Sequence, residues 1–170
     1  MFSASMNKNK LISPFRSASH HHQECLQSAI AAAKKHCDNS GLRLTPIRQR
    51  VLELVWQNHE PVKAYDILDK LKQAKSSSAP PTVYRALDFL QDEGLVHKIE
   101  SLNAYVGCGN PKEMHKSQFF ICHDCGAVAE LDDKDIRDLL QKKAQRFGFK
   151  IDDEMVEIKG RCQACRQAEK

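Results

Sequence analysis

Two cysteine pairs of identical spacing constrain the C-terminal part of this chain more than any other feature. Cys122 and Cys125 form the first pair, and Cys162 and Cys165 form the second. A Cys-x-x-Cys turn directs two thiolates at one ion, and two such turns complete the closed, all-sulfur tetrahedral shell that suits structural Zn²⁺. A disulfide or a redox-active pair is the alternative, but the chain starts without a secretory signal and we expect a reducing cytosol around it. The spacing therefore predicts a zinc ion that holds the C-terminal half together.

The length of 170 residues allows one ordinary domain or two small ones. Each half of such a chain has a marginal core, so a structural metal or a partner subunit is expected. No apolar run is long enough to span a bilayer, and we expect a cytoplasmic protein without a membrane partner. The net charge of +4 permits nucleic-acid binding without arguing for it.

Residues 1–24 show no periodic apolar pattern and are predicted to form a disordered tail. The tail contains the run His20-His21-His22, which we interpret as an adventitious metal binder at most. Residues 24–39 are rich in alanine, with apolar residues at helical spacing, and predict the first helix.

Three further helices are predicted before residue 94. Thr45-Pro46 opens one of them, because threonine can cap a helix and proline fits its first turn. Residues 64–71 carry the apolar spacing of the next helix, and Pro80-Pro81 begins another that stops at Gly94.

After Gly94 the apolar pattern alternates, which predicts two short strands at residues 95–99 and 104–106. Helices followed by a small hairpin are typical of a winged helix-turn-helix, which we assign to residues 25–108. Residues 109–117 contain glycine, asparagine and proline, as expected of a hinge. Residues 118–170 then predict a second, small α/β domain, so that the whole chain falls in the α+β class.

The fourth helix carries polar side chains that are candidates for reading DNA. Thr82, Tyr84 and Arg85 lie off its apolar stripe, and recognition helices present their N-terminal residues to base edges in the major groove. The forked guanidinium of an arginine suits guanine. Ordinary solvated side chains are the competing interpretation. Candidates for contact with the DNA backbone are Tyr65, Arg43, Arg48 and Lys63.

Four other residues are candidates for a second metal shell: His97, Cys108, His115 and Glu130. Each alone has an ordinary interpretation, as a core histidine, a small buried hydrophobe, a loop residue and a strand carboxylate. Their positions around the hairpin, the hinge and the strand after the first cysteine pair favour a joint one. Two imidazoles, one thiolate and one carboxylate suit Zn²⁺, whereas the sulfur disfavours Mn²⁺ or Mg²⁺. The sequence leaves open whether the four converge.

Residues 43–165 resemble the Fur family of bacterial metal-responsive repressors, and within it the zinc-sensing branch. Five segments carry the resemblance: LTP with Arg48, AYDIL at 64–68, PPTVYRALDFL at 80–90, GLVHK at 94–98 and FICHDCG at 120–126. The third and fifth segments are specific for the family.

The resemblance implies a homodimer on double-stranded operator DNA, in which the first domain binds DNA and the second dimerises. It implies two Zn²⁺ ions per subunit, a structural one on the four paired cysteines and a regulatory one on the second set of candidates. Tyr65 and Arg85 then resemble operator contacts. Asp69 and Lys72 resemble residues that form salt bridges between neighbouring dimers on DNA, although an arginine is familiar at the second position. The implied function is zinc-responsive repression, with zinc uptake genes as the expected targets.

Three alternatives remain at this point. Iron-type relatives carry a histidine-rich run before the first cysteine pair, where this chain has His115 only, but a regulator that senses iron or manganese stays an alternative. A zinc hydrolase or deaminase needs an open coordination position and a general base, and neither HExxH nor HxE with PCxxC is present, so we expect no enzyme. A zinc-ribbon adaptor that binds only protein is the third.

Overall fold

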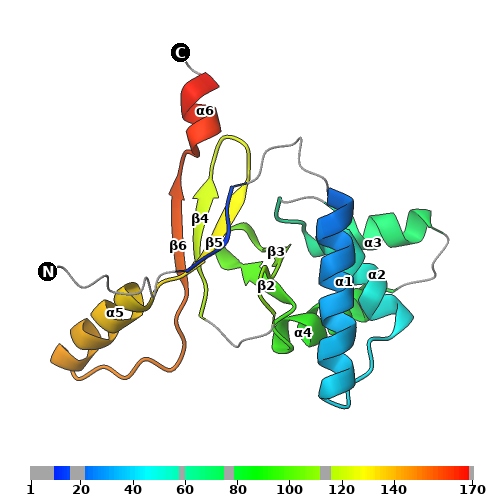
Figure 1. Cartoon of the computed structure of the whole chain (residues 1–170), viewed down its shortest axis with the longest axis horizontal. Coiled ribbons are helices and arrows are strands. Elements are labelled where there is room, and N and C mark those ends of the chain that lie inside the picture. The colour runs from blue at the N-terminus through cyan, green and yellow to red at the C-terminus, as the bar shows by residue number, and fades with distance from the viewer. Residues whose placement is uncertain (1–9, 16–21, 58–59, 75–78, 112–115, 169–170) are drawn as a thin grey trace, which may run out of the picture. The chain divides into compact units, whose positions relative to one another are not determined.

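The structure is a computed structural model that describes residues 10–15, 22–57, 60–74, 79–111 and 116–168 (Figure 1). The chain divides into two compact units. We call residues 16–114 the helical unit, and residues 1–15 together with 115–170 the sheet unit. The boundary at residue 115 falls within the segment predicted as a hinge. Among the described residues, no helix combines the length and the apolar character needed to cross a membrane.

In the described part of the helical unit, four α-helices and a two-stranded hairpin follow one another in the order expected of a winged helix-turn-helix. The helices are α1 (His22–Asn39), α2 (Pro46–Val55), α3 (Ala64–Gln73) and α4 (Pro80–Asp92). The hairpin, or wing, consists of β2 (Val96–Ile99) and β3 (Ala104–Gly107), joined through a short 3₁₀ helix (Glu100–Leu102). The predicted α+β class is confirmed.

Helix boundaries in this unit follow the local chemistry. The Thr45 hydroxyl accepts a hydrogen bond from the backbone N–H of Arg48, and Pro46 occupies the first turn of α2. After α4, Gly94 adopts a φ of +64°, a left-handed conformation that glycine takes without a steric penalty. The chain then enters β2.

The core of the helical unit is formed by aliphatic side chains from α2, α3 and α4. Leu52, Ile67 and Leu87 are fully buried in it. Burial of one such side chain contributes about 1.5–3 kcal/mol to stability. The wing is attached to this core through paired backbone hydrogen bonds between Val62 and Tyr105, of 2.9 and 2.8 Å.

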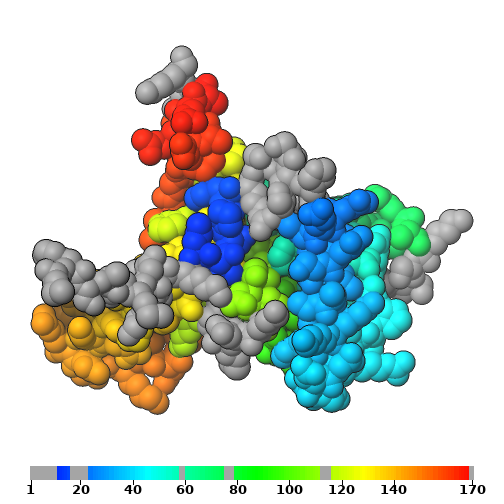
Figure 2. All heavy atoms as spheres, viewed as in Figure 1, coloured from blue at the N-terminus to red at the C-terminus, as the bar shows by residue number. Residues whose placement is uncertain are grey.

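A four-stranded sheet with the order β1-β5-β4-β6 organises the sheet unit. Strands β4 (Gln118–Cys122) and β5 (Val128–Asp132) are antiparallel, whereas β6 (Val156–Gly160) runs parallel to β4. Helix α5 (Lys134–Arg146) connects β5 to β6 and α6 (Gln163–Ala168) follows. No residue of α5 is buried, and the helix forms part of the surface in Figure 2.

The N-terminal segment corrects the prediction that residues 1–24 form a disordered tail. Lys10–Ser13 form strand β1, which pairs antiparallel with the outer edge of β5, and α1 begins at His22, two residues before its predicted start (Figure 1). An edge strand presents unpaired N–H and C=O groups that a segment from elsewhere in the chain can satisfy. This pairing is distant in sequence, so the local pattern gave no signal for it. Residues 1–9 and 16–21, which include His20 and His21, lie outside the described residues.

Candidate metal centres and nucleic-acid interface

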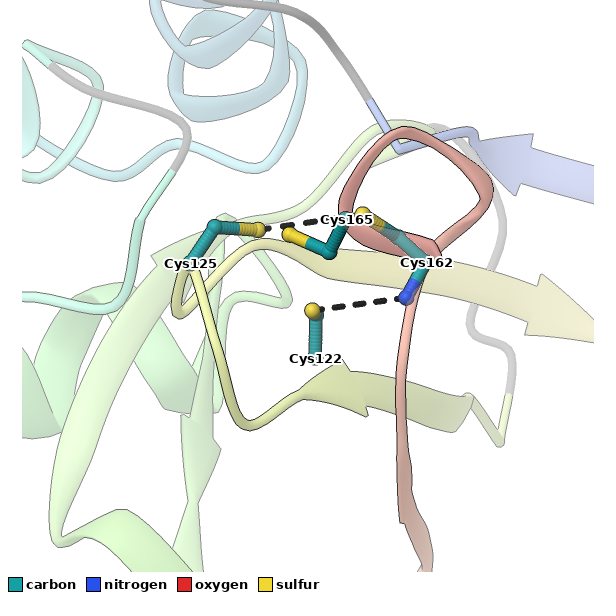
Figure 3. A group of neighbouring side chains, drawn as sticks. All are labelled: Cys122, Cys125, Cys162 and Cys165. Carbon is teal, nitrogen blue, oxygen red and sulfur yellow. Dashed lines mark hydrogen bonds between the residues drawn. The ribbon is translucent and has the colours of Figure 1, made fainter. Parts of the chain in front are cut away.

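Strand pairing brings the two Cys-x-x-Cys turns together. Cys122 ends β4 and lies opposite Gly160 in the parallel register with β6, so that Cys162 follows directly beside it. Cys125 lies in the turn after β4, and Cys165 lies in α6. Figure 3 shows the four side chains grouped between these turns. The turn after β4 closes through a 2.9 Å hydrogen bond from the N–H of Gly126 to the carbonyl of Cys122.

The four sulfur atoms have the spacing of a zinc shell. All four lie within 4.8 Å of one another, and the Sγ atoms of Cys125 and Cys162 are 3.8 Å apart. A tetrahedron with Zn–S bonds of about 2.3 Å has S···S edges of about 3.8 Å. The donor set therefore fits one tetrahedrally coordinated Zn²⁺ with every position taken by protein.

The fold favours the thiolate form of one cysteine of this cluster, Cys122. The backbone N–H of Cys162 donates a 3.3 Å hydrogen bond to Cys122 Sγ, and this bond is the main cause that lowers the pKa of Cys122 to about 6. Hydrogen bonding with Cys162 acts in the opposite direction on Cys165, whose pKa is raised. The cluster thus has an ionised first ligand near neutral pH, and completing the shell releases protons from the remaining thiols.

The wing brings two members of the second candidate set together within the helical unit. His97 is paired with Val106, and Cys108 lies two residues beyond Val106 on the same face of the hairpin. The ligand atoms of His97 and Cys108 lie within 4.8 Å of each other. Cys108 is 2% exposed and His97 is half-buried. The N–H of Cys108 donates to the carbonyl of Leu95 at 3.1 Å, which holds the chain against β2 just past the end of β3.

The sheet unit contributes a third member of that set, Glu130. Glu130, on β5, is 3% exposed and its Oε1 accepts a 2.6 Å hydrogen bond from the Ser117 hydroxyl. A buried carboxylate needs such partners, because removing a charge from water is costly. The sequence did not predict a role for Ser117, because a serine in a polar connecting segment gives no sign of a partner thirteen residues away. His115 lies outside the described residues.

The candidate DNA-reading side chains of the helical unit are accessible to different degrees. Tyr65, at the start of α3, is 71% exposed, while Tyr84 and Arg85 are exposed on α4 and Thr82 is half-buried. Helix α4 is thus available for the role of a recognition helix, with its apolar residues turned into the core and its polar residues outward.

Asp69 and Lys72 are exposed on α3, with their charged groups 4.0 Å apart. Arg48 is the candidate for contact with the DNA backbone whose side-chain contacts within the unit are the most specific. Its guanidinium lies over the ring of Phe89 and donates to the carbonyl of Arg43 at 2.7 Å.

Comparison with known proteins shows the family of this chain. Residues 39–159 match the model of the ferric uptake regulator family. The chain belongs to this family. Members of the ferric uptake regulator family regulate transcription, so the chain is a regulator and not an enzyme.

The similar members of the family include zinc regulators. The chain is 42% identical to the zinc uptake regulation protein of Escherichia coli (strain K12) over 144 residues, which cover 84% of each chain. A solved structure of a zinc uptake regulator complexed with zinc and DNA has a TM-score of 0.78 and 41% identity, covering 89% of this chain and 99% of the other. The holo form of XcZur has a TM-score of 0.76 and 43% identity, covering 82% and 98%.

Proposed function

We propose that the chain is a zinc-responsive transcriptional repressor that acts in the cytoplasm and controls zinc uptake genes. It binds operator DNA as a zinc-loaded homodimer. The imidazole–thiol pair of His97 and Cys108 on the wing is the observation that carries the proposal, because it adds a mixed donor set to the all-sulfur cluster. Identity of 42% to a zinc uptake regulation protein supports the choice of metal and targets.

The two donor sets have different tasks in this proposal. Cys122, Cys125, Cys162 and Cys165 hold the structural Zn²⁺, and His97, Cys108, His115 and Glu130 hold the regulatory one. Soft sulfur with imidazole and carboxylate suits Zn²⁺, whereas Mn²⁺ prefers oxygen-rich sites. The Ser117 hydroxyl donates a hydrogen bond to the Glu130 carboxylate and so fixes the direction in which its oxygens point.

The proposed regulation depends on the fact that the residues that bind the regulatory Zn²⁺ come from both units. His97 and Cys108 belong to the helical unit, and Glu130 belongs to the sheet unit. When bound, Zn²⁺ supplies directed bonds to donors of both units. The loaded chain thereby favours one arrangement of the units, the one in which both α4 helices of a dimer fit DNA. A shift from 1% to 99% of that arrangement needs a differential affinity of about 5.5 kcal/mol. By linkage, DNA raises the zinc affinity by the same factor as zinc raises the DNA affinity.

The sheet unit, formed mostly by residues 118–170, is proposed as the dimerisation domain, and residues 25–108 are proposed as the DNA-binding domain. The surface of the sheet unit is rich in exposed apolar side chains along α5, β6 and the segment between them. Such a concentration marks an interface in a chain of this size. The residues are Leu139, Leu140, Phe147, Phe149, Met155 and Ile158.

DNA contacts are assigned to the exposed face of the helical unit. Arg85 reads base edges from α4, together with Thr82 and Tyr84, while Tyr65 contacts the operator from α3. Asp69 and Lys72 join neighbouring dimers on the same operator.

The proposal is tested by titrating operator binding against buffered free Zn²⁺, Fe²⁺ and Mn²⁺, with the metal content of the protein measured at each step. We expect two zinc ions per subunit and DNA binding that follows the second. The Cys108→Ser variant should keep one zinc ion and its dimeric state but lose zinc-dependent binding. Cys25→Ser is the matched control, because Cys25 belongs to neither metal-ligand group of the described residues. Repression by Cys108→Ser in proportion to zinc, or a response to Fe²⁺ or Mn²⁺ instead, contradicts the proposal.

A further inference from the structure

The tryptophan of this chain, Trp56, lies directly against Gly107, the last residue of β3 and the residue before Cys108. A Cβ atom placed on Gly107 would come within 2.1 Å of Trp56 Cε2 and 2.3 Å of Trp56 Nε1. Real Cβ atoms do not approach carbon or nitrogen this closely, so the indole occupies the space that any side chain at position 107 needs. Trp56 therefore packs on bare backbone at the end of β3.

Position 107 requires a glycine because the Trp56 ring approaches it closely, and not because of its backbone conformation. The described glycines with positive φ are Gly41, Gly94, Gly126 and Gly148, and Gly107 is not among them. An alanine fits the backbone of an extended strand, so the obstacle to a larger residue is the indole. The two residues form a matched large-and-small pair.

The contact connects the residue before the proposed zinc ligand Cys108 to helix α2. Trp56 caps the C-terminus of α2, where its N–H donates to the carbonyl of Leu52, and its side chain packs against the core of the unit. Helix α2 packs in turn against α4. Gly107 is the residue before Cys108 and is paired with Val96 in β2. The indole of Trp56 therefore limits where the backbone can lie one residue before Cys108.

We propose that Trp56 is a positioning residue for the regulatory zinc site, acting through Gly107 to fix the direction of Cys108. The same contact makes Trp56 an intrinsic reporter of metal occupancy at His97 and Cys108. This inference rests on the proposed function, because it concerns the same regulatory site.

Tryptophan fluorescence of the full-length protein tests the proposal, with Cys108→Ser as the control variant. The protein is first loaded at the four-cysteine site, and its emission is then followed while buffered free Zn²⁺ is raised. We expect a change whose midpoint coincides with uptake of the second zinc ion and which Cys108→Ser abolishes. Uptake of the second ion with constant emission would overturn the proposal.

A double-mutant cycle tests the positioning role itself. Gly107→Ala should weaken binding of the second zinc ion about tenfold to a hundredfold, the range typical of groups that orient metal ligands, while the first ion is retained. In the Trp56→Ala background the same substitution should have little further effect, because the obstructing ring is gone. An equal penalty in both backgrounds shows that Trp56 is not the cause and overturns the inference.

The zinc content of the wild type separates failure of this inference from failure of the proposed function. A wild type that takes up only one zinc ion overturns both. A wild type that takes up two ions, together with an unaffected Gly107→Ala variant, overturns this inference alone.

Discussion

The guanidinium of Arg48 lies 3.5 Å from the centre of the Phe89 ring. This cation–π contact joins the first turn of α2 to the last part of α4, and the 2.7 Å hydrogen bond to the carbonyl of Arg43 orients the guanidinium further. Arg48 therefore helps to hold α4, the helix proposed to read DNA, against α2.

Replacing Arg48 by alanine should lower the stability of the helical unit by about 0.5–2 kcal/mol, the range of a partly desolvated cation–π contact. The salt dependence of operator binding should stay unchanged, because a residue that does not neutralise a phosphate releases no counterion. Thermal unfolding and a gel shift at several salt concentrations measure the two effects. Arg85→Ala is the contrasting variant, expected to keep its stability, to lose about 1–3 kcal/mol of binding and to relax base preference. A reduced salt slope for Arg48→Ala would place Arg48 on the phosphates instead.

Removal of one structural cysteine should unfold the sheet unit. Cys122→Ser leaves three sulfur ligands and loses the thiolate that the N–H of Cys162 stabilises, so the zinc content should fall by one ion per subunit. Circular dichroism and metal analysis of the purified protein provide the measurement. Cys25→Ser should retain the full metal content. A folded Cys122→Ser dimer with unchanged zinc would show that the cluster is not a structural site.

Dimer formation should depend on the exposed apolar surface of the sheet unit. Phe149 is 65% exposed in the protomer, and Phe149→Asp would bury an unpaired charge in the proposed interface. We expect a monomer with the secondary structure of the wild type, measured by analytical ultracentrifugation. Leu42→Asp alters an exposed apolar residue of the helical unit and should remain dimeric. Equal behaviour of the two variants would place the interface elsewhere.

Loading of adjacent dimers should depend on the charges of α3. Asp69 and Lys72 are exposed, and their 4.0 Å pair within one helix contributes only about 0.3–0.5 kcal/mol, so Asp69→Lys should leave stability nearly intact. The same variant should remove cooperative binding to an operator long enough for two dimers. Combining Asp69→Lys with Lys72→Asp exchanges the two charges and should restore cooperativity. Unaltered cooperativity in the single variant would exclude these residues from the contact between dimers.

Local chemistry was sufficient to predict most elements of the helical unit. Thr45-Pro46 marked the start of α2, and Pro80-Pro81 marked the start of α4. The change from helical to alternating apolar spacing after Gly94 indicated the wing. These signals depend on residues within one or two turns of each other, which is why a single sequence reveals them.

Signals that depend on distant pairing were missed. Strand β1 has no alternating pattern of its own and is specified by the open edge of β5. The limits of β6, Val156–Gly160, follow from its parallel register with β4, and no local signal in the sequence marks them. At the candidate sites, the cysteine spacing predicted the four-sulfur cluster, whereas the Ser117 hydrogen bond to Glu130 and the fit of Trp56 on Gly107 arise only from packing.

Strand β1 makes the helical unit an insertion between two segments of the sheet unit, since the chain enters residues 16–114 from β1 and returns to the sheet at residue 115. A protease that cleaves once between Gly109 and Lys116 therefore leaves the larger N-terminal fragment holding one strand of the sheet to which the other fragment belongs. The two fragments should elute together under native conditions and separate only in denaturant.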